Sequence, residues 1–221
     1  PGEKIVCEGD SATNRGGGAP GDTWAYLRLM NWDRCWPDFL GEVLFCGWPH
    51  LNLTLRNAAV SGSSCRSVAG RLEDVVLPLE PDWLLVTLGG NDARLGIEPS
   101  EVESTLADYA ARLNEEFGTR TVFIGAYCDA PHRPAKMTWE RIGPYYDVFE
   151  KLAAENDYVH ALVLWDALGR QARALAEQWE HHTMFTGPDG HWNAVGARLM
   201  AMELMRAFGL MAPDPPYGSD T

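Results

Sequence analysis

Four short segments of the sequence place chemically active side chains at turns, and they are residues 8–11, 57–62, 88–92 and 189–193. Together they offer a hydroxyl, an imidazole, carboxylates and amides. Acyl transfer needs such a set: a nucleophile, a base that takes its proton, a group that orients the base, and donors for the oxyanion. Each segment alone is weak, because a turn in which serine caps a helix is common. The four in combination indicate acyl-transfer chemistry.

The order and separation of these segments resemble the signature blocks of SGNH (GDSL-type) hydrolases, and the resemblance extends over residues 5–208. It implies that Ser11 attacks an ester carbonyl. It also implies that His191 takes the serine proton and later returns one to the leaving alcohol, while Asp189 orients the imidazole. The resemblance implies no cofactor and no metal.

The same resemblance assigns an oxyanion hole to three groups. They are the backbone N–H of Ser11, the backbone N–H of Gly62 and the side-chain amide of Asn91. A glycine at position 62 lets the backbone approach a substrate closely. Asn57 and Asp92 stand beside these groups, and we expect them to bond loop backbone rather than take part in the chemistry.

The last segment departs from the commoner family pattern, in which the aspartate lies three residues before the histidine. Here position 188 is Pro188, and Asp189 lies only two residues before His191. In an extended loop residues i and i+2 point to the same side, so Asp189 is able to reach the imidazole. With Trp192 the pattern is similar to that of some polysaccharide O-acetylesterases and O-acetyltransferases of this superfamily. Ala59 stands where glycine is common, which concerns shape rather than chemistry.

Two other patterns favour different chemistry. Glu180, His181 and His182 lie near His191 in the sequence and with it offer ligands for a metal-dependent hydrolase. The stretch lacks a pair of histidines at helical spacing, so we expect no metal. Residues 16–21 match G-x-G-x-x-G, but no apolar strand precedes them, and we expect no dinucleotide site. A non-catalytic carbohydrate-binding domain is a further alternative.

The elements that must position these groups alternate along the chain. Short apolar runs predict strands at 4–7, 53–58, 83–88, 121–127 and 159–164, and apolar residues at helical spacing predict helices at 100–117, 139–152, 167–179 and 195–208. Strand followed by helix indicates an open parallel sheet, which binds ligands at the carboxyl ends of its strands. We expect a three-layer α/β/α sandwich around a five-stranded flavodoxin-like sheet, with the order 2-1-3-4-5 that the resemblance implies.

Composition narrows the function classes. The 221 residues are 46% hydrophobic and 22% charged, and they carry a formal net charge of −13 that disfavours nucleic acid as a partner. No apolar run reaches the roughly 18 residues of a membrane span. Five cysteines, an odd number without a C-x-x-C pair, favour a reducing compartment and so weakly favour the cytoplasm. We expect one domain over residues 3–210 and a short Pro- and Asp-rich tail at 211–221.

The sequence therefore predicts a serine esterase that cleaves small-acyl esters through an acyl-enzyme. An O-acetylated carbohydrate is the first candidate substrate, and a lysophospholipase, a thioesterase or an O-acetyltransferase with the same triad is the alternative. Four of the nine tryptophans, at positions 24, 32, 36 and 48, fall between the nucleophile and the second strand. We expect most of them in the core and some at a substrate cleft. Acyl length, leaving group and oligomeric state stay open.

Overall fold

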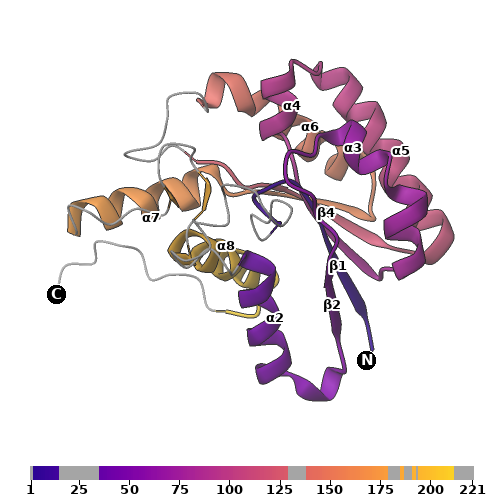
Figure 1. The fold of residues 1–221 in the computed structure, drawn as a ribbon, viewed down its shortest axis with the longest axis horizontal. Helices are drawn as coiled ribbons and strands as arrows, with labels where there is room; N and C mark the ends of the chain where they lie inside the picture. The colour runs from indigo at the N-terminus through magenta and orange to yellow at the C-terminus, as the bar shows by residue number, and fades with distance from the viewer. Residues whose placement is uncertain are drawn as a thin grey trace, which may run out of the picture.

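A computed structural model describes residues 2–14, 35–128, 138–178, 185–186, 191–192 and 194–211. Its centre is a five-stranded sheet of β1 (Lys4–Gly9), β2 (Thr54–Asn57), β3 (Trp83–Thr87), β4 (Arg120–Gly125) and β5 (Val159–Val163). The strand order is β2-β1-β3-β4-β5, and every neighbouring pair is parallel. The predicted strands and their order are confirmed, with ends that differ by at most two residues (Figure 1).

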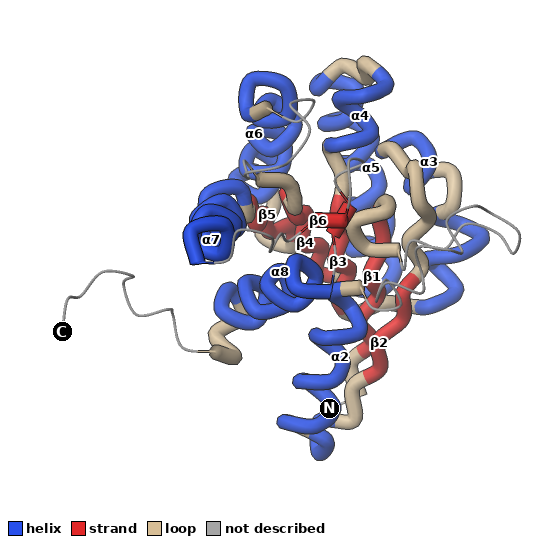
Figure 2. Tube along the Cα trace, turned by 60° about the vertical axis from the view of Figure 1, so that its left-hand side comes forward, coloured by secondary structure: helices blue, strands red, loops and turns tan. Residues whose placement is uncertain are grey.

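Helices cover both faces of this sheet. They are α2 (Trp36–Gly47), α3 (Cys65–Ala69), α4 (Gly90–Leu95), α5 (Pro99–Phe117), α6 (Trp139–Glu155), α7 (Trp165–Gln178) and α8 (Ala194–Ala207). Shorter helical turns lie at Pro49–Leu51, Leu72–Val76 and Leu77–Leu79, and β6 (Phe185–Thr186) pairs antiparallel with β7 (His191–Trp192). Figure 2 shows α3, α4, α5 and α6 on one face and α2, α7 and α8 on the other. The expected three-layer sandwich is confirmed.

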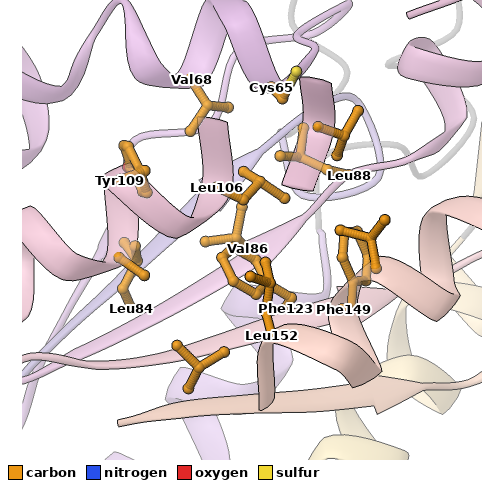
Figure 3. Packing of buried hydrophobic residues seen from close by; sticks show 14 of the residues in the cluster. Cys65, Val68, Leu84, Val86, Leu88, Leu106, Tyr109, Phe123, Phe149 and Leu152 are labelled. Carbon is orange, nitrogen blue, oxygen red and sulfur yellow. The ribbon is translucent and has the colours of Figure 1, made fainter. Parts of the chain in front are cut away.

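Successive side chains along each strand point to opposite faces of the sheet, and this divides the core in two. Leu84 and Val86 of β3 face the layer of α3, α5 and α6, whereas Leu85 faces the layer of α2, α7 and α8. Both kinds of position are buried, which is why the strands read as continuous apolar runs. Figure 3 shows the first core, where Phe123 of β4 stacks on Phe149 of α6 with ring centroids 5.5 Å apart.

The long helices follow the sequence prediction closely. Helix α5 begins with Pro99 at its first turn and ends at Gly118, whose φ of +71° is a left-handed conformation that glycine adopts without strain. The 12-residue helix α2 and the short helices α3 and α4 are absent from the sequence prediction. Trp36 is fully buried at the start of α2, as expected for a core tryptophan, while positions 24 and 32 lie outside the described residues. No helix in the described part of the chain is long and apolar enough to span a bilayer.

Candidate active site

Ser11 stands just after β1, at the carboxyl end of the central strands. The turn begins at Gly9, whose φ of +130° is closed to other residues, and a Cβ there would lie 2.3 Å from the backbone oxygen of Thr87. Asp10 N–H donates to the Thr87 carbonyl at 3.3 Å, and Asn14 N–H donates to the Asp10 carbonyl at 2.9 Å. This tight turn holds Ser11, which is half-buried, at the sheet edge.

The Asp10 carboxylate beside Ser11 is completely buried, and its role was missed in the sequence. Its Oδ1 accepts from the N–H of Ala12 at 2.8 Å and lies 3.5 Å from the hydroxyl of Thr87. The Thr87 hydroxyl is also hydrogen-bonded to the hydroxyl of Thr13, which accepts from the indole N–H of Trp36 at 3.0 Å. A series of hydrogen bonds therefore connects Trp36 of α2, by way of Thr13 and Thr87, to the residue before the serine.

The other oxygen, Asp10 Oδ2, receives two side-chain donors. Asn91 Nδ2 and the hydroxyl of Tyr127 each lie 3.3 Å from it. Burial raises the pKa of Asp10 to about 6, and the nearby carboxylate of Asp92 adds to the rise. The hydrogen bond from Tyr127 and the charge of His191 oppose it, which places His191 within electrostatic range of Asp10.

Gly62 and Asn91, two of the expected oxyanion donors, are linked through one residue. Asn91 Nδ2 donates to the backbone oxygen of Ser63 at 3.0 Å, and Ser63 follows Gly62 directly. Gly62 is exposed, has a φ of +83°, and has nothing within 4 Å of an added Cβ. The backbone conformation therefore requires glycine here, and the position faces open space.

His191 is half-buried on β7, opposite Thr186 of β6. Asn91 links Asp10, the neighbour of Ser11, to Ser63, the neighbour of Gly62, and His191 lies within electrostatic range of Asp10. Asp189 lies outside the described residues, so its orientation of the imidazole stays a prediction.

Two neighbouring polar residues bond loop backbone, as expected from the sequence. The buried carboxylate of Asp92 accepts from Gly89 N–H at 3.1 Å and from Cys65 N–H at 2.8 Å, which ties the start of α4 to the start of α3. Asn57 donates to the backbone oxygen of Thr13 at 2.9 Å, so it fastens the end of β2 to the turn after Ser11.

Tyr127 is a site residue that sequence reasoning missed. Its phenol ring covers Gly90, where an added Cβ would lie 2.4 to 2.5 Å from the ring and hydroxyl atoms. Its backbone N–H donates to the hydroxyl of Tyr146 at 3.0 Å, and the Tyr146 ring closely approaches Gly89. The glycine pair before Asn91 was therefore the available signal, because a side chain at 90 would displace the Tyr127 ring and the φ of +102° at 89 favours glycine.

The two alternative patterns are not tested by the residues that the structure describes. Within them no three His, Cys, Asp or Glu side chains come together as metal ligands. Glu180, His181, His182 and residues 16–21 lie outside the described part of the chain.

With this geometry in view, comparison with known proteins decides the family. A model of the GDSL-like lipase/acylhydrolase family matches residues 7–199, which include all four polar segments. The chain belongs to this family. The resemblance found in the sequence is thereby confirmed.

Individual members of the GDSL-like family support the assignment. The chain is 31% identical over 139 residues to the Escherichia coli (strain K12) protein named thioesterase 1/protease 1/lysophospholipase L1, an alignment that covers 53% of this chain and 64% of that protein. It therefore spans less than two thirds of the length of that relative. It is 29% identical over 91 residues to an acetylxylan esterase of Geobacillus stearothermophilus, covering 41% of this chain and 40% of that protein.

The fold is also that of solved family structures. The structure of a putative GDSL-like lipase from Parabacteroides merdae superposes with a TM-score of 0.74 at 21% identity, and the match covers 95% of this chain and 96% of that one. At this identity the likeness concerns the fold alone.

Proposed function

We propose that this chain is a serine esterase that cleaves small-acyl esters through an acyl-enzyme. The observation that carries the proposal is that Asn91 Nδ2 lies 3.3 Å from the buried carboxylate of Asp10, the residue before Ser11, with His191 within electrostatic range of the same carboxylate. Membership of an acylhydrolase family supports it.

In the proposed mechanism, Ser11 Oγ attacks the ester carbonyl while the neutral imidazole of His191 takes the hydroxyl proton. The oxyanion that forms accepts from the N–H groups of Ser11 and Gly62 and from the Asn91 amide. Collapse of this intermediate expels the alcohol, which receives the proton from His191. Water then attacks the acyl-enzyme by the same steps, and the acid leaves. Asp189 orients His191 throughout.

Asn91 needs one adjustment to serve as a donor. In the structure one Nδ2 hydrogen is directed to Ser63 and the other to Asp10. The bond to Asp10 is 3.3 Å long, near the upper limit for N–H···O, and the bond to Ser63 is 3.0 Å. The hydrogen on the Asp10 side is therefore the one that turns to the oxyanion, and the Tyr127 hydroxyl then remains on Asp10.

The favoured substrate is an O-acetylated carbohydrate. The Asp-x-His-Trp pattern and the acetylxylan esterase among the relatives support this choice. A thioesterase or lysophospholipase is the second candidate, supported by the Escherichia coli relative. The net charge of −13 favours neutral esters over anionic lipids.

The proposed catalytic unit is residues 3–210, acting on a small-molecule or carbohydrate ester and not on nucleic acid. All five cysteines are free, which supports a reducing compartment such as the cytoplasm.

Covalent labelling by a fluorophosphonate tests the proposal. We expect labelling of the wild type, loss of label in Ser11→Ala, and unchanged labelling in Ser104→Ala, which alters an exposed serine of α5 far from the site in sequence. Absence of label together with loss of activity in a chelator would overturn the proposal in favour of a metal-dependent hydrolase. Absence of both label and turnover would favour a binding domain.

Hydrolysis of para-nitrophenyl esters of increasing chain length, beside acetylated xylo-oligosaccharides, separates the substrate candidates. A preference for acetyl esters and the oligosaccharides supports the first candidate. A rate that rises with acyl length supports the second.

A further inference from the structure

A buried ion pair lies directly behind the site. Glu8, on β1, has a completely buried side chain, and its Oε1 binds Arg71, whose side chain is 19% exposed. The same oxygen accepts from Gly9 N–H at 3.1 Å. Burial raises the pKa of Glu8, and the guanidinium of Arg71 opposes this rise.

This pair is a poor source of stability. Removing two charges from water carries a large cost, which only a fully hydrogen-bonded geometry offsets. Glu8 Oε2 and Arg71 Nε are both buried with no hydrogen-bond partner among the described residues. Apolar side chains of similar volume would stabilise the fold as well, so the pair calls for another role.

Arg71 reaches from Glu8 to the loop that carries Gly62. Its Nη1 donates to Ser63 Oγ at 3.0 Å and to the backbone oxygen of Ser67 at 3.1 Å. Ser63 Oγ in turn donates to the carbonyl of Val60 at 2.6 Å, which closes the turn around Gly62.

Ser63 also contacts the other proposed donor, because its backbone oxygen accepts from Asn91 Nδ2 at 3.0 Å. Ser63, which is 3% exposed, therefore links the two proposed oxyanion donors, Gly62 and Asn91. Arg71 fixes that residue, and Glu8, three residues before Ser11 on the strand that leads to it, fixes Arg71.

We propose that Arg71, held by Glu8, is a positioning residue that sets the spacing of the oxyanion donors through Ser63. This inference rests on the proposed esterase function. The planar guanidinium is suited to the task, because its fork of donors binds the carboxylate and the serine in one fixed geometry. Donors that are placed in advance act on the transition state, so their misplacement lowers kcat and leaves KM nearly unchanged.

Two variants test the link while keeping both charges. Ser63→Ala removes the hydroxyl that Arg71 holds and leaves the ion pair and the backbone oxygen in place. Arg71→Lys keeps a cation for Glu8 but loses the fork. We expect each to lower kcat for para-nitrophenyl acetate roughly 10- to 100-fold, as misplacement by about 1 Å does, with KM within about twofold.

The double variant Ser63→Ala/Arg71→Lys should be no slower than the slower single variant, because both changes break the same link. Arg66→Lys is the matched control. Arg66 lies on α3, five residues before Arg71, and pairs with Glu101 instead of Glu8, so its change should leave kcat and KM unaltered.

Circular dichroism and thermal melting accompany each assay, so that rates refer to folded protein. If the wild type is active, three results would each overturn this inference and leave the proposed function intact. They are a Ser63→Ala variant whose kcat equals that of the wild type, a variant whose KM rises while its kcat stays unchanged, and a double variant whose loss of kcat is the product of the two single losses. A wild type that neither hydrolyses esters nor takes the fluorophosphonate label overturns the proposed function, and the inference with it.

Discussion

The carboxylate of Asp10 makes stability depend on pH in a defined direction. Burial raises its pKa to about 6 in the folded protein, against 3.8 for an ordinary aspartate. Between these values the folded state binds more protons than the unfolded chain, so the free energy of unfolding that Asp10 contributes is greatest below pH 4 and falls as pH rises through 6. The expected fall is of the order of 3 kcal/mol.

Urea unfolding of wild type and Asp10→Asn at pH 4 and pH 7.5 isolates this contribution. The advantage of wild type over the variant in free energy of unfolding should shrink with rising pH, whatever the variant loses in hydrogen bonds. An advantage that is constant would show that the pKa is not raised, and one that grows would show that it is lowered.

The amide of Asn91 is expected to act on the transition state. Asn91→Ala should lower kcat by about 10²- to 10³-fold, equivalent to ~2.7–4 kcal/mol, with little change in KM. Steady-state kinetics on para-nitrophenyl acetate measure this, and Asn114→Ala, at the distant end of α5, is the control. An equal loss in Asn114→Ala, or an effect confined to KM, would argue against the oxyanion role.

At the level of elements, length and periodicity decide what the sequence reveals. Helix α5 was predictable because its 19 residues carry a full apolar stripe and end at Gly118. Helices α3 and α4, of five and six residues, are too short to show such a stripe. Tertiary contacts such as those of Asp92 stabilise them instead.

The residues of the candidate site likewise fall into those that the sequence could indicate and those that it could not. Ser11, Gly62, Asn91 and His191 could be proposed from the sequence because each lies in a short local motif. The contact of Tyr127 with Asp10 joins residues 117 apart in the sequence, and no local pattern reports it. Ion pairing of Glu8 with Arg71, 63 residues apart, is hidden for the same reason.

The start of α4 depends on the absence of a side chain at Gly90. An alanine there would displace the Tyr127 ring and its hydroxyl from Asp10, so Gly90→Ala should destabilise the fold by about 1–3 kcal/mol and lower kcat. Thermal melts and ester hydrolysis test this. Gly47→Ala, where no atom lies within 4 Å of the added Cβ, should be nearly neutral.

Removing the obstructing ring supplies a further check. If the loss arises from this clash, Gly90→Ala should cost less stability in a Tyr127→Ala background than in wild type. Equal costs in the two backgrounds would mean that the ring does not set the requirement for glycine.

For the whole molecule, the charge of −13 predicts an effect of salt on substrate choice. The Debye length falls from roughly 30 Å at 0.01 M to about 8 Å at 0.15 M salt. Over this range kcat/KM for an anionic ester should rise several-fold, whereas that for a neutral ester of the same acyl group should stay constant. A flat response for both substrates would show that the net charge does not reach the site.

The two layers of the sandwich differ in how the chain builds them. Helices α3, α5 and α6 come from the middle of the chain, whereas α2 and α8, which pack together on the opposite face, come from widely separated parts (Figure 1). Closing the loop between α2 and α8 has the larger entropic cost, so we expect this layer to assemble late. Because His191 lies three residues before α8, docking of this helix would also bring the proposed catalytic base to the site. The nascent chain would then gain hydrolytic competence only as its second core closes.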